Sequence, residues 1–211
     1  MNVHSLKNMK IKQKYTSRQI QIINNAIELI GTNGIQGLTI KTLSEKTGIV
    51  ESAIYRHFKS KHILLDNTLN YLKEYVINNF RSIEKLDLSS TDKLKMLYSK
   101  QLEAFTKNPS YIIVLLSDGI YKNNAVLRKI IYSIMQEAKQ KLTKIFESGI
   151  KKGELRNDIE SDQMAFIFMA SMRLIVTQWG LSDFGFDLNK KGERLRKTLN
   201  RLLINNSKKI K

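Results

Sequence analysis

The chain has 211 residues, of which 42% are hydrophobic and 26% charged, and it contains one proline, ten glycines and no cysteine. The lack of cysteine excludes disulfides, thiolate metal sites and a cysteine nucleophile, and so few turn-forming residues favour an all-α fold over a many-stranded sheet. The net charge of +17 favours an anionic partner, either nucleic acid or an acidic membrane surface.

Residues 1–15 are expected to form a basic arm, and they lack the apolar run of a secretory signal, which favours a cytoplasmic protein. From Ser17 onward, one predicted helix face is apolar, and Gly31 and Gly34 are expected to end this helix. The face consists of isoleucines at helical spacing: Ile20, Ile23, Ile27 and Ile30.

Two short helices are predicted next. Thr39 is expected to cap the first, and Gly48 to supply the left-handed turn that ends it. The second covers Glu51 to Phe58, and its buried face carries Ile54 and Phe58, four residues apart. Its start is weakly capped, because residue 50 is a valine.

The remaining chain is also predicted to be helical. Ser60 is expected to cap a long helix, and Thr91 or Asp92 to start another that Pro109 breaks. The other predicted helices are an amphipathic one over 124–146, one over 162–179 that is apolar on nearly all sides, and a basic final one over 190–203.

At the two short helices the sequence resembles the TetR family of bacterial regulators. The resemblance is detailed over residues 17–72. The motifs that carry it are Leu38-Thr39-Ile40, Leu43-Ser44, Thr47-Gly48-Ile49 and the run AIYRHFKSK at 53–61. The resemblance implies a three-helix helix-turn-helix DNA-binding domain over 16–62. It also implies a helical ligand-binding and dimerisation domain over 63–211.

The resemblance also implies roles for single residues. Base edges would be read by Ser52, Ala53 and Arg56, and phosphates would be held by Thr39, Tyr55, His57 and Lys61, with Lys41 in the same DNA-facing set. Hydroxyls and helix N-termini suit phosphates, and arginine suits guanine. Glu51 repels phosphate but can accept a hydrogen bond from the amino group of cytosine. Which bases are read therefore stays open. A core position for Tyr55 and a packing position for His57 are the structural alternatives.

The family further implies a homodimer formed by the last two helices. The sequence supports this, because a helix that is apolar on nearly all sides must be covered on nearly all sides. The candidate interface residues are Met164, Ile167, Phe168, Ile175, Trp179, Leu195, Leu199 and Leu202. The alternative is a buried central helix in a monomer.

A small apolar or amphipathic effector is the third partner that the resemblance implies, beside double-stranded DNA and a second copy. Its candidate lining is aromatic and flexible: Tyr98, Phe105, Tyr111, Met135, Met169, Met172 and Arg173. An ordinary core role is the alternative for each residue. Arg173 is expected either to pair with Asp118 or Glu103, or to meet an anionic ligand.

Other classes of protein fit less well. All three histidines lie within the first 62 residues, so the sequence predicts no enzyme, no catalytic residue, no metal and no cofactor. The apolar run over 164–176 is too short to span a bilayer, which predicts no membrane partner unless the basic final helix binds lipid. A DNA-bound dimer whose body docks a protein instead of a small ligand remains the main alternative.

Overall fold

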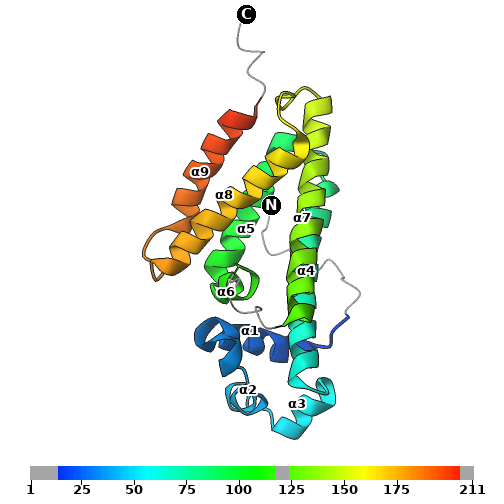
Figure 1. Cartoon of the computed structure of the whole chain (residues 1–211), viewed down its shortest axis with the longest axis vertical. Helices are drawn as coiled ribbons and strands as arrows, with labels where there is room; N and C mark the ends of the chain where they lie inside the picture. Colours follow the sequence, from blue (N-terminus) through cyan, green and yellow to red (C-terminus); the bar gives the residue numbers. More distant parts are fainter. Residues whose placement is uncertain (1–13, 117–123, 205–211) are drawn as a thin grey trace, which may run out of the picture.

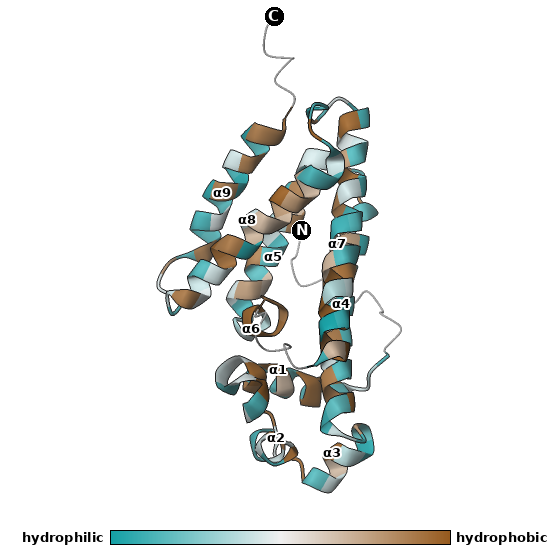
Figure 2. Cartoon of the chain, viewed as in Figure 1, coloured by the Kyte–Doolittle hydropathy of each residue, from teal (hydrophilic) through white to brown (hydrophobic). Residues whose placement is uncertain are grey.

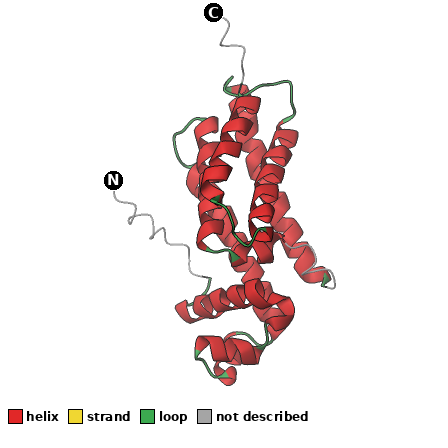
Figure 3. Ribbon diagram, turned by 90° about the vertical axis from the view of Figure 1, so that its left-hand side faces the viewer, coloured by secondary structure: helices red, strands yellow, loops and turns green. Residues whose placement is uncertain are grey.

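The computed structural model describes residues 14–116 and 124–204, and this part of the chain is helical except for its connections and an isolated bridge between Leu155 and Ile204 (Figures 1 and 3). The predicted all-α fold is confirmed. The helices are α1 (Ser17–Gly37), α2 (Ile40–Thr47), α3 (Glu51–His57), α4 (Lys61–Glu84), α5 (Ser90–Lys107), α6 (Ser110–Leu116), α7 (Ala125–Lys151), α8 (Ser161–Leu181) and α9 (Leu188–Leu203). Most of the predicted basic arm lies outside the described residues.

The caps predicted in the first 62 residues are present. Thr39 accepts from the backbone N–H of Thr42, and Gly48 has a φ of 67° at the end of α2. Ser60 accepts from the N–H of Ile63 and so begins α4, whereas Val50 makes no side-chain cap for α3. These contacts join residues three apart, so the local sequence suffices to determine them.

Some predicted boundaries are wrong. Gly34, with a φ of 69°, interrupts α1, but Gly31 stays inside the helix, which runs on to Gly37. Ser89 rather than a later residue caps α5, since its hydroxyl accepts from the N–H of Asp92. Both α7 and α8 are longer than their apolar patterns, because helices continue past the last buried residue until a capping geometry ends them.

The molecule has two parts joined by α4. The first three helices gather at one end, with α2 and α3 at the tip, and α5 and α7 to α9 form an elongated bundle beyond α1 (Figure 1). We call residues 16–62 the reading head and the described residues from 63 onward the body. The continuous α4 crosses from one to the other, and a single apolar core extends through both.

The short helix α6 provides a second connection between the parts. It packs across α1 (Figure 1). At the crossing, a Cβ added to Gly31 would lie 2.3 Å from the Oγ of Ser110, so only glycine permits this approach. Beside it, the rings of Tyr75 and Tyr111 pack edge to face, with their centroids 5.7 Å apart. The head and the body are therefore held together by tight packing as well as by chain continuity.

The helix α8 is the most apolar of the long helices (Figure 2). At 21 residues it is the one described helix that is long and apolar enough to cross a membrane by length and composition. The helix is thus longer than the apolar run over 164–176 on which the sequence-based expectation rested. Its buried side nonetheless packs inside the bundle, with Met164, Phe168 and Val176 in the core.

Candidate DNA-binding surface and effector cavity

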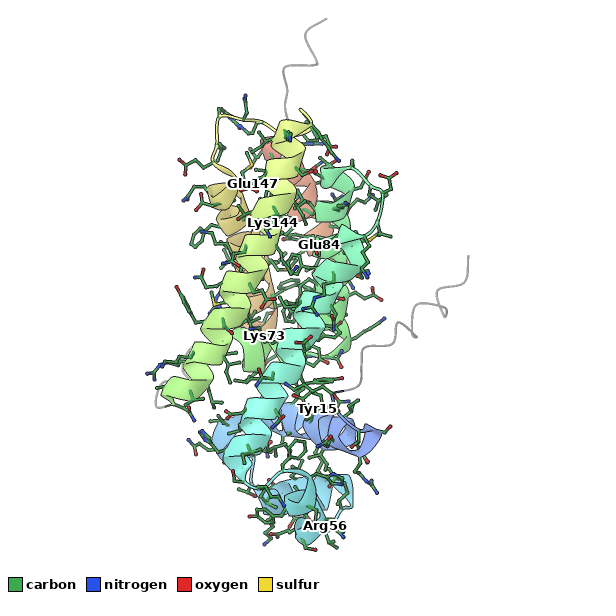
Figure 4. The ribbon with its side chains drawn as sticks, turned by 90° about the vertical axis from the view of Figure 1, so that its right-hand side faces the viewer. Tyr15, Arg56, Lys73, Glu84, Lys144 and Glu147 are labelled. Atoms are coloured by element: carbon green, nitrogen blue, oxygen red, sulfur yellow. The ribbon has the colours of Figure 1, made fainter. Side chains whose placement is uncertain are left out.

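The helix α3 presents a polar face at the tip of the reading head. Ile54 is fully buried and Phe58 nearly so, which turns Ser52, Tyr55 and Arg56 outward. Tyr55 is 43% exposed and is therefore not a core aromatic. Figure 4 shows Arg56 at the far end of the molecule from the body. The exposed face required by the sequence-based hypothesis exists.

The polar groups of this face are available to a partner. Within residues 14–116 and 124–204, no side-chain hydrogen bond or ion pair of the protein engages Lys41, Tyr55 or Arg56. Glu51 occupies the first turn of α3, where it complements the helix dipole. An unpaired guanidinium beside an exposed phenol and hydroxyl suits base edges and phosphate oxygens.

Four other predicted DNA contacts are less free. The Nζ of Lys61 donates to the carbonyl of Ile35 at 3.3 Å. The hydroxyl of Thr39 is exposed but already bonds Thr42. Ala53 and His57 are only partly exposed, and Ala53 packs against the core. Thr39 thus acts as the predicted cap, and Lys61 has a structural role that the sequence motifs did not reveal.

A cavity of about 350 Å³ lies in the body between α4, α5, α6, α7 and α8. Its walls are mainly apolar, which suits an apolar ligand. Five of the residues predicted to line an effector site border this cavity: Phe105, Met135, Met169, Met172 and Arg173. Sequence reasoning missed Leu115 and Leu116 at the end of α6, as well as Phe166 and Lys139.

The other two residues predicted to line an effector site do not border this cavity. Tyr98 is fully buried behind Phe168, which does line the cavity, and the two rings pack edge to face with their centroids 5.2 Å apart. Tyr111 packs against Tyr75 near the crossing of α6 and α1. Burial, with smaller contributions from Tyr71 and Tyr75, raises the pKa of Tyr111 to about 12, so this phenol stays neutral at physiological pH.

Two cationic side chains border the cavity. The guanidinium of Arg173 donates to the carbonyl of Leu116 at 2.8 Å, so it holds the end of α6. Glu103, one of its expected partners, instead pairs with Lys107 at 2.6 Å, and the other, Asp118, lies outside the described residues. The ammonium of Lys139 pairs with Asp162 at 3.1 Å. An anionic ligand group would therefore compete with these partners for the N–H donors of the two cations.

Most of the predicted dimer residues lie inside the protomer. The interior ones are Met164, Phe168, Ile175, Trp179 and Leu199, which are all buried in a single chain. Side chains that are buried by their own protomer have little surface left for a partner, so the structure gives these five residues a core position. Ile167 and Leu202 are 44% and 56% exposed, and Leu195 is half-buried. Phe166 and Leu174, which the sequence analysis did not single out, are strongly exposed.

The architecture and the exposed face of α3 agree with the comparisons to known proteins. A family model described as bacterial regulatory proteins of the tetR family matches residues 22–68, and one described as the C-terminal region of YsiA-like proteins matches residues 70–205. The chain belongs to the TetR family. It is a helix-turn-helix transcriptional regulator and not an enzyme.

Characterised members of the TetR family align over most of their length. The fatty acid metabolism regulator protein of Bacillus subtilis (strain 168) is 24% identical over 178 residues, 84% of this chain and 91% of the relative. The repressor KstR2 of Rhodococcus jostii (strain RHA1) is 22% identical over 166 residues, 78% of this chain and 80% of the relative. The structure of FadR from B. subtilis with stearoyl-CoA has a TM-score of 0.74 and 22% identity, covering 85% of this chain and 96% of that one.

Proposed function

We propose that this TetR-family protein is a cytoplasmic repressor that binds a palindromic operator as a homodimer and is released by a largely apolar effector with an anionic group. The single observation that carries the proposal is the mainly apolar cavity whose wall includes the end of α6. Because α6 also packs on α1, a ligand in the body can influence the reading head. A body that only docks a protein would not need such a cavity.

The chemistry of the cavity favours an acyl chain. Its mainly apolar walls suit hydrocarbon, and Arg173 and Lys139 supply charge at its border. Relatives support this class: FadR from B. subtilis was solved with stearoyl-CoA, and a relative is named a fatty acid metabolism regulator. We therefore propose a long-chain fatty acyl thioester or a related amphipathic anion as the effector.

Release would follow from differential affinity. The DNA-bound dimer requires its two heads to match half-sites one or more turns apart, about 34–36 Å per turn. An anionic group that competes for Arg173 would weaken its hydrogen bond to the carbonyl of Leu116. Since α6 contacts α1, the effector would favour a state in which the heads no longer match the operator.

The proposal is tested by operator selection followed by effector titration. Selection from a random duplex pool should yield a palindrome, and stearoyl-CoA should release the wild-type protein from it. Arg173→Ala removes the hydrogen bond to Leu116 even without effector, so it should bind the operator more weakly than wild type. Its affinity for stearoyl-CoA should fall about tenfold or more, since a charge-assisted hydrogen bond contributes about 1.5–3 kcal/mol. Fluorescence anisotropy of the labelled operator measures both quantities.

Two controls complete this experiment. Arg173→Lys keeps the charge and should retain part of the response, and Lys107→Ala removes an exposed cation outside the cavity and should respond like wild type. If the wild-type protein selects no duplex at moderate salt, the proposed function is wrong. If Arg173→Ala responds as wild type does, the role of Arg173 is wrong.

A further inference from the structure

The effector cavity is not closed by the protomer's own side chains. Several of its wall residues are also surface residues: Phe166 is 61% exposed, Met135 is 41% exposed, and Gln136 and Ala170 are exposed as well. These residues come from α7 and α8, so the cavity opens to the surface between the two helices. An acyl chain bound in a single protomer would remain in contact with water at this opening.

The opening adjoins a larger apolar face of α8. Phe166, Ala170 and Leu174 form one row at four-residue spacing, and the first two of them border the cavity. Leu174 is 62% exposed and does not line the cavity. The exposed residues of α8 are all uncharged: Gln163, Phe166, Ile167, Ala170, Leu174, Gln178 and Leu181. We call this set the α8 face.

We propose that a second copy of this chain covers the α8 face and closes the cavity, so that the effector site is complete only in the homodimer. The inference rests on the proposed function and adds a structural requirement to it. A bound acyl chain would then lie between its own protomer and the partner, near Phe166 and Ala170.

Charge and geometry favour a second copy as the occupant. Two chains of net charge +17 repel one another, which favours close approach through an uncharged surface. The α8 face is uncharged over the length of a 21-residue helix. Side chains in rows of four-residue spacing also interdigitate with an identical row, which is the commonest way in which two helices pack. A two-fold contact of α8 with itself satisfies both conditions.

The test disrupts the dimer without changing a residue that lines the cavity. Leu174→Arg places a charge on the α8 face without altering a lining residue. Sedimentation should show a monomer, and isothermal titration with stearoyl-CoA should show an affinity at least about fivefold lower than wild type, the lower end of ordinary coupling between linked sites. Leu86→Arg, the same substitution at a residue 40% exposed outside α8, should remain dimeric and bind normally.

A second measurement does not depend on the variant. Diluting the wild-type protein through its dimer dissociation range should lower its affinity for stearoyl-CoA, and stearoyl-CoA should in turn strengthen the dimer. A Leu174→Arg protein that stays dimeric, or a monomer that binds as tightly as wild type, overturns the proposal. A wild-type protein that binds its operator but not stearoyl-CoA overturns it together with the effector class, while leaving operator binding intact.

Discussion

Arg56 is the side chain of the reading head best suited to read a base. It lies on the exposed face of α3, and no described residue pairs with it. Arg56→Ala should weaken operator binding by about 1–3 kcal/mol and relax the sequence preference at one position of each half-site. Anisotropy titrations against the selected operator and its single-base variants measure both effects.

A substitution in the body serves as the control for nonspecific effects of removing a positive charge. Lys144→Ala removes one exposed cation from α7, far from Arg56 (Figure 4), and should leave the preference unchanged. An equal loss of affinity for the operator and for random duplexes in Arg56→Ala would refute base reading and leave only a phosphate contact.

At the residue scale, sequence reasoning succeeded where the physics is local. Thr39 and Ser60 cap their helices through contacts three residues away, and the weak cap at Val50 follows from its lack of a side-chain acceptor. It failed where partners come from distant segments. The contacts of Lys61 with Ile35 and of Arg173 with Leu116 span 26 and 57 residues, and no periodicity encodes them.

At the element scale, α6 connects the cavity to the reading head. Leu115 and Leu116 at its end line the cavity, and Ser110 at its beginning touches Gly31 of α1. Gly31→Ala should force α1 and α6 apart, because the new Cβ would lie within 3 Å of both the side chain and the backbone of Ser110. We expect a loss of about 1–3 kcal/mol in unfolding free energy, as for overpacked cores, measured by urea denaturation.

Gly180→Ala is the matched control. Gly180 is also helical, but its nearest neighbour to an added Cβ is 3.7 Å away, so alanine should leave stability unchanged or raise it by about 0.5–1 kcal/mol. If both substitutions have the same effect, the close contact between α1 and α6 does not constrain the head. A stability loss in Gly31→Ala accompanied by a shifted stearoyl-CoA response would support α6 as the connection.

The pattern of apolar residues along a helix explains why the buried and exposed residues of α8 were not separated from the sequence. An amphipathic helix such as α7 reveals its buried side by its pattern, and Asn124 and Leu127 behave as predicted. A helix that is apolar on nearly all sides carries no such signal, so its interior and exposed faces were not separable. Phe168 packs against Tyr98 and Phe146, while Phe166, two residues earlier, is exposed. The structure was needed to assign these two residues.

At the scale of the whole molecule, net charge and symmetry make a joint prediction about salt. The chain is basic throughout, since residues 1–61 carry 10 Lys or Arg and 3 Asp or Glu, while the rest carries 26 and 16. Bulk charge therefore does not identify the phosphate contacts. Lys41 is the clearest candidate, because it is exposed on α2 and, unlike Lys61, is not held by a backbone carbonyl of the protein.

Each phosphate contact steepens the dependence of log Kobs on log salt by about 0.9. In a homodimer every contact is made twice, so Lys41→Ala should flatten the slope by about 1.8 on the full operator. In the Leu174→Arg background, binding a half-site as a monomer, the same substitution should flatten it by about 0.9. The ratio of the two slope changes gives the number of reading heads that contact the DNA. If Lys41→Ala leaves the salt slope unchanged, Lys41 does not contact a phosphate. If the slope changes equally in both backgrounds, only one reading head of the dimer contacts the DNA.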